Sequence, residues 1–66
     1  MYRIETWENA REIHYTDALN IQQVEANLSR NSDGVRLAVL EDLRKGHTDV
    51  YIDFADRTFT ITKLDI

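Results

Sequence analysis

A chain of 66 residues is long enough for one small domain with a thin core, and its formal net charge of −4 disfavours binding to phosphate backbones. It contains no cysteine, which excludes disulfides and thiolate metal sites. No apolar run approaches the roughly 20 residues that span a bilayer, and the first residues lack the basic and then apolar pattern of a secretory signal. We therefore expect a single cytoplasmic domain over residues 1–66.

Residues 2–15 alternate in the manner of a β-hairpin. Apolar or β-branched side chains occupy every second position of each arm: Tyr2, Ile4 and Thr6, then Ile13 and Tyr15. Pairing Thr6 with Ile13 also pairs Ile4 with Tyr15, so one register satisfies both pairs. The turn at Asn9-Ala10 is weaker than Asn-Gly would be, but it joins the two arms.

The period changes between residues 16 and 31. Ile21, Val24 and Leu28 recur at spacings of three and four, which predicts one amphipathic helix. Asn20 followed by Gln23 has the form of a capping box, while Thr16 or Asp17 would start a longer helix. The turn formers of residues 31–34 end the helix.

Residues 35–45 fit two interpretations. As a strand, Val35, Leu37 and Val39 would point to one face and extend the sheet into a meander. As a helix, the segment would place a Glu41–Lys45 pair four residues apart and a glycine, Gly46, just past its end. Residue propensity favours the helix.

Residues 48–64 predict a second hairpin. One pairing sets Phe54 opposite Phe59 and Ile52 opposite Ile61, which satisfies both apolar positions at once. In that register the core receives five side chains: Val50, Ile52, Phe54, Phe59 and Ile61.

Together these segments predict an α+β fold, in which an N-terminal and a C-terminal hairpin form one antiparallel sheet. One or two helices cover one face of that sheet, in the order ββααββ, or ββαβββ if residues 35–45 are a strand. The hairpins are expected side by side, because a two-stranded hairpin is marginal alone.

No motif in the chain specifies catalysis or metal binding. Neither Ser29 nor Ser32 is spaced from a histidine as a triad requires, and His47 with Asp49 lacks the further ligands of a tetrahedral site. We therefore expect no catalytic, metal or cofactor site, and we expect that the protein is not an enzyme.

The sheet face turned away from the helices is predicted to be acidic and aromatic. Tryptophan and tyrosine dominate binding hot spots, and carboxylates around them suit a basic partner. The residues of the predicted protein-binding face are Trp7, Tyr51, Asp49, Asp53, Glu5, Glu12 and His14. The alternatives are that Trp7 and Tyr51 are cross-sheet packing pairs, or that the face is the seam of a homodimer.

The sequence identifies no family, although in size and plan it resembles a small bacterial or phage accessory protein. The first hypothesis is a small acidic inhibitor or adaptor that binds a larger protein. The second is a homo-oligomeric assembly component, joined through an edge strand or the open sheet face. The third and least favoured is a nucleic-acid-binding regulator, which depends on Arg44 and Lys45.

Overall fold

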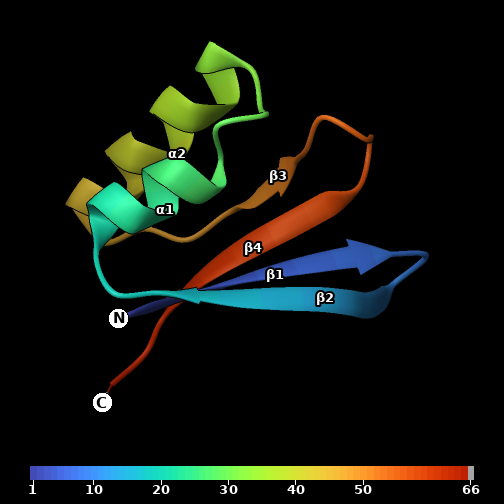
Figure 1. The fold of residues 1–66 in the computed structure, drawn as a ribbon, viewed down its shortest axis with the longest axis horizontal. Coiled ribbons are helices and arrows are strands. Elements are labelled where there is room, and N and C mark those ends of the chain that lie inside the picture. The colour runs from blue at the N-terminus through green and yellow to red at the C-terminus, as the bar shows by residue number, and fades with distance from the viewer. Residues whose placement is uncertain (66) are drawn as a thin grey trace.

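The computed structural model describes residues 1–65, which form an antiparallel four-stranded sheet with two helices on one face (Figure 1). The elements in chain order are β1 (Tyr2–Glu8), β2 (Arg11–Ala18), α1 (Ile21–Asn27), α2 (Asp33–Lys45), β3 (Val50–Ile52) and β4 (Thr58–Lys63). The predicted order ββααββ is confirmed, and a strand over residues 35–45 is wrong. The sheet order is β2-β1-β4-β3, so the two hairpins lie side by side through β1 and β4. No helix in this part of the chain is long and apolar enough to cross a membrane.

The start of α1 and the end of α2 lie where the sequence predicted them, whereas α1 ends at Asn27, before the predicted turn at residues 31–34, and α2 begins at Asp33. The Asn20 side chain accepts a hydrogen bond from the Gln23 N–H at 3.0 Å, so α1 begins there and not at Thr16 or Asp17. Ser32 caps α2 in the same way, accepting from the N–H of Val35 at 3.3 Å. Gly46 ends α2 in the left-handed region with φ of 74°.

The first hairpin departs from its predicted register at a β-bulge. Next to the turn, Trp7 pairs with Glu12, but beyond it Thr6 pairs with His14, which leaves Ile13 as the extra residue. The predicted pairs Thr6–Ile13 and Ile4–Tyr15 are therefore wrong. Because a shift of one residue inverts the two faces, Tyr15 lies away from the helices and His14 lies toward them.

The second hairpin also has a different register, because its loop begins earlier than predicted. The Asp53 carboxylate accepts hydrogen bonds from the N–H groups of Ala55 and Arg57 at 2.8 and 3.0 Å, and so holds residues 53–57 in a loop. Phe54 belongs to that loop and pairs with no strand residue.

As a result, the predicted pairs Phe54–Phe59 and Ile52–Ile61 are wrong. The observed pairs are Val50 with Thr60, Tyr51 with Phe59 and Ile52 with Thr58. Phe59 and Ile61 are buried as predicted, whereas Val50, Ile52 and Phe54 are 61%, 59% and 49% exposed.

The core lies between the sheet and the two helices. Its buried members come from every element except β3: Ile4, Ala18, Val24, Leu28, Val39, Phe59 and Ile61. In β1, Ile4 faces Ile61 and Thr6 faces Phe59 on β4, so the central strand pair supplies the floor of the core. The other face of the sheet has no covering layer among residues 1–65 (Figure 1).

Candidate protein-binding face

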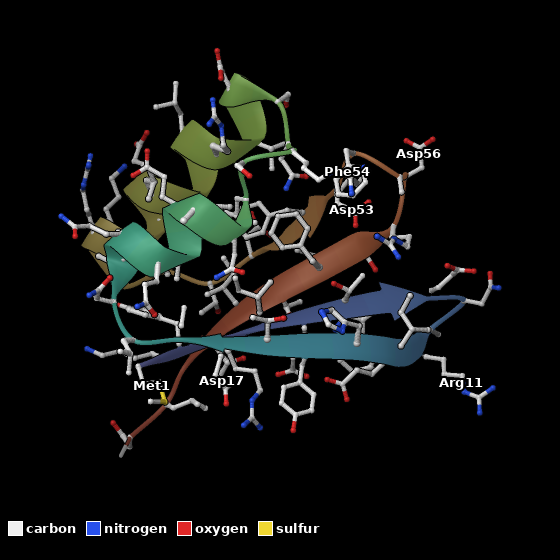
Figure 2. The ribbon with its side chains drawn as sticks, in the orientation of Figure 1. Met1, Arg11, Asp17, Asp53, Phe54 and Asp56 are labelled. Carbon is white, nitrogen blue, oxygen red and sulfur yellow. The ribbon has the colours of Figure 1, made fainter. Side chains whose placement is uncertain are left out.

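The uncovered side of the sheet, called the open face below, is defined by strand alternation. The buried side chains beneath the helices are Ile4, Thr6, Phe59 and Ile61. The residues that alternate with them along β1 and β4 point to the other side of the sheet, and so do the β2 and β3 residues that pair with those alternate residues. Figure 2 shows Asp17 on this side of the sheet, away from the helices. The open face consists of Arg3, Glu5, Trp7, Glu12, Tyr15, Asp17, Val50, Ile52, Thr58, Thr60 and Thr62.

Trp7 lines a shallow groove that crosses the open face between β1 and β3. Its indole Nε1 donates to the Thr60 hydroxyl at 3.4 Å, across β1 and β4, so the ring is oriented by a neighbouring strand. Asp49, just before β3, and Glu5 line the same groove. The half-buried indole ring can contact an apolar group of a partner, and the two neighbouring carboxylates can bind a cationic group.

Apolar side chains flank this groove. Val50 and Ile52 on β3 are 61% and 59% exposed, and Tyr15 on β2 is 54% exposed. All three lie on the open face because of the observed strand registers. A cluster of exposed apolar side chains rimmed by polar ones is typical of a protein-interaction surface.

The charge of the open face is predominantly negative. One of its carboxylates, Asp17, binds the Arg3 guanidinium through two contacts of 2.7 and 3.1 Å. Hydrogen bonding to Arg3 lowers the pKa of Asp17 below its usual value, so the pair is fully ionised near neutral pH. The Arg3 guanidinium also lies 4.4 Å from the centroid of the Tyr15 ring.

Glu5 and Glu12 form a second pair, with charges of like sign. Hydrogen bonding to the Glu5 carboxyl group raises the pKa of Glu12, and desolvation and the negative charge of Glu5 raise it further. These two carboxyl groups lie next to Trp7 on the open face, where they contribute to its acidic character. A bound cation would favour the fully ionised form.

The structure brings together some of the predicted site residues and separates others. Trp7, Glu5 and Glu12 lie on the open face as predicted, and Asp49 lines its groove. Tyr51, Asp53 and His14 do not lie on it.

Each of the separated residues has another set of contacts. Tyr51 packs against Phe59 on the helix side, and its hydroxyl donates to Asp42 on α2 at 2.6 Å. Asp53 shapes the loop over residues 53–57, and His14 contacts the Thr16 hydroxyl at 3.0 Å on the helix side.

Sequence reasoning missed Tyr15, Val50 and Ile52 as members of the open face. For Val50 and Ile52, the sequence did contain a signal. Asp53 is a turn-forming residue, and a loop that begins there shifts the register of β3 to the one observed. The bulge that turns Tyr15 outward has no local signal in the sequence.

This chain matches no protein-family model, no curated protein and no solved structure. Residues 1–65 also contain no group of three or more histidine, aspartate or glutamate side chains placed to hold a metal ion. The function proposed below therefore depends on the geometry of the open face.

Proposed function

We propose that this protein is a non-enzymatic interaction module, an inhibitor or adaptor, that binds a basic and partly apolar surface of a larger protein through its open face. The observation that carries this proposal is the Trp7 groove. Its charged lining residues, Glu5 and Asp49, are both acidic, and exposed Val50 lies at its edge.

The chemistry of the groove indicates what such a partner presents. Trp7 supplies a large, oriented aromatic surface, and a lysine or arginine of the partner would lie between the Glu5 and Asp49 carboxylates. A standard interface buries about 800 Å² on each partner. Against the total accessible surface of 4693 Å², that area corresponds to roughly one face of this molecule.

The same charges argue against a symmetric homodimer through the open face. A two-fold interface places the same patch of both copies in contact, so Glu5 and Glu12 would approach their counterparts. Like charges opposed across an interface disfavour the complex. Nucleic-acid binding is also disfavoured, because Lys45 forms an ion pair with Glu41 at 2.6 Å and the open face is acidic.

The proposal is tested by affinity capture followed by mass spectrometry, with two matched variants. Trp7→Ala removes the groove's aromatic side chain, whereas Leu37→Ala removes a 66% exposed side chain from α2, in the helical layer. We expect a captured protein to be retained by wild type and Leu37→Ala and lost by Trp7→Ala. Glu5→Gln should weaken its binding in low salt more than in high salt.

Two results would contradict this function. One is equal capture of every partner by wild type and Trp7→Ala, with amide NMR spectra showing that both are folded. The other is a dimer in light scattering that Trp7→Ala converts to a monomer, which would make the open face a self-association surface.

A further inference from the structure

A cleft lies on the opposite side of the sheet from the open face. Its floor is formed by β1 and β2, with Thr6 and His14 among the lining residues, and its walls by the segment after α1 and the loop over residues 53–57. Asp53 and Phe54 of that loop lie on the helix side of the sheet (Figure 2). The cleft encloses about 260 Å³, less than the 300–1,000 Å³ typical of pockets for drug-sized ligands, so its occupant must be small.

Two arginines from different segments line the wall of this cleft. The guanidinium carbon of Arg30, just after α1, lies 4.3 Å from the centroid of the Phe54 ring, and that of Arg57 lies 5.9 Å from it. The segments are held together by a hydrogen bond from the Phe54 N–H to the Asn31 side chain at 3.1 Å. The ring and this bond therefore bring two cationic side chains to the same aromatic ring and the same cleft.

The positive charge of the cleft is only partly neutralised. Asp53, with a side chain that is 7% exposed, contacts the Arg57 Nε at 3.3 Å and is otherwise occupied by backbone N–H groups of its own loop. Within residues 1–65, Arg30 has no carboxylate partner. The cleft is therefore lined by two guanidinium groups and one carboxylate, although the chain as a whole has a net charge of −4.

We propose that this cleft binds a small phosphate-bearing molecule, with Arg30 and Arg57 donating to the phosphate oxygens and His14 supplying a further polar contact from the floor. Guanidinium groups donate hydrogen bonds in a planar fork that matches phosphate oxygens, and two forks from different segments suit a tetrahedral group with several free oxygens better than a planar carboxylate. The acidic charge of the whole chain and the small volume exclude an extended polyanion such as nucleic acid.

Inorganic phosphate is the probe for the test, titrated into isotope-labelled protein at constant ionic strength and followed by amide NMR. We expect saturable shifts confined to residues around the cleft, at positions 6, 14, 16, 27–31 and 53–59. Arg30→Gln should weaken phosphate binding by about tenfold or more, because it removes a charge-assisted contact. Arg11→Gln is the matched control, since Arg11 lies beside the β1–β2 turn (Figure 2) and does not line the cleft.

Three outcomes would overturn the proposal. The first is the absence of saturable shifts, or shifts spread over all basic residues. The second is an equal loss of affinity in Arg30→Gln and Arg11→Gln. The third is acetate binding as tightly as phosphate, which would leave no preference for a tetrahedral anion. If Arg30→Gln does not fold, Arg30→Lys keeps the charge without the planar fork and is expected to lose part of the affinity. Each outcome is independent of binding at the open face.

Discussion

Tyr51 and Phe59 face each other across β3 and β4, with ring centroids 5.2 Å apart and an angle of 33° between the ring planes. This one pair fixes which side chains of β3 lie on the open face. Because Tyr51 points toward the helices, its neighbours Val50 and Ile52 point away from them. The Tyr51 hydroxyl reinforces the arrangement by donating to Asp42 on α2 at 2.6 Å, which joins β3 to the helical layer.

Tyr51→Phe should destabilise the fold while leaving its packing intact. The substitution removes the hydrogen bond to the Asp42 carboxylate, which we expect to cost about 1 kcal/mol and to lower Tm by about 4–8 °C in a domain of this size. Tyr15→Phe is the matched control, because no hydrogen bond from the Tyr15 hydroxyl occurs in residues 1–65. Thermal unfolding followed by circular dichroism measures both, and equal Tm values would show that the Asp42 contact contributes nothing.

Ionisation of the Tyr51 hydroxyl should lower the stability of the folded protein in alkali. Burial, and then the hydrogen bond to Asp42, raise the pKa of Tyr51 well above its ordinary value of 10.0. The folded state therefore holds this proton more tightly than the unfolded state does. The resulting stabilisation is complete below about pH 10 and is lost as the pH rises toward the folded-state pKa.

Wild type should accordingly lose unfolding free energy above pH 10 faster than Tyr51→Phe does. Urea unfolding at a series of pH values provides the comparison. Parallel pH profiles for the two proteins would contradict the assignment.

The two glycines of the chain should respond to alanine in opposite directions. Gly46 has φ of +74°, where a side chain is strained, so Gly46→Ala should cost about 1 kcal/mol although its Cβ would meet no atom within 4 Å. Gly34 lies inside α2 with the same open surroundings, so Gly34→Ala should stabilise by roughly 0.5–1 kcal/mol. Urea midpoints test both, and the double variant should lie near wild type. Shifts of the same sign would refute this account.

The β1–β2 turn carries strain that a single substitution should relieve. Asn9 and Ala10 have φ of 54° and 61°, the conformation of a two-residue type I′ turn, which alanine adopts at a cost. Ala10→Gly should therefore stabilise the protein by about 0.5–1 kcal/mol. Ala55→Gly, in a loop position without positive φ, should destabilise it slightly and serves as the control. A loss of stability in Ala10→Gly would contradict the turn assignment.

The Glu5–Glu12 pair should make stability fall as the pH rises from the acid range to neutrality. Because the folded-state pKa of Glu12 is raised above its ordinary value of 4.5, the stabilisation is present below that value and is lost as the pH rises through the folded-state pKa. Glu12→Gln should remove this dependence, whereas Glu25→Gln, on the exposed side of α1, should keep it. Unfolding measurements from acid to neutral pH test the difference, and identical profiles for the two variants would contradict the raised pKa of Glu12.

Much of the fold could be predicted from local pattern. The Asn20 cap and Gly46 are short-range signals, and they placed the start of α1 and the end of α2 correctly. Alternation in the first strand placed Trp7 and Glu5 on the open face. The structure has the predicted alternation in β1, with Ile4 and Thr6 toward the helices.

Strand register was decided by tertiary structure. The bulge at Ile13 and the loop organised by Asp53 each shift a pairing, and a shift inverts or displaces every side chain beyond it. In the first hairpin, the register depends on which side chains fit beneath the helices, and no local pattern marks it. In the second hairpin, Asp53 is a local loop signal that strand alternation alone does not reveal, and the contacts of Tyr51 with Phe59 and Asp42 agree with it. That is why Tyr15, Val50 and Ile52 joined the open face and Tyr51 left it.

The cleft with Arg30 and Arg57 shows the same division. Its residues come from both hairpins and from the segment after α1, and no local spacing connects them. Composition and periodicity are properties of neighbouring residues, so they specify elements and the polarity of their faces. The packing of distant elements decides which of their side chains meet at one site. That information is present only in the folded chain.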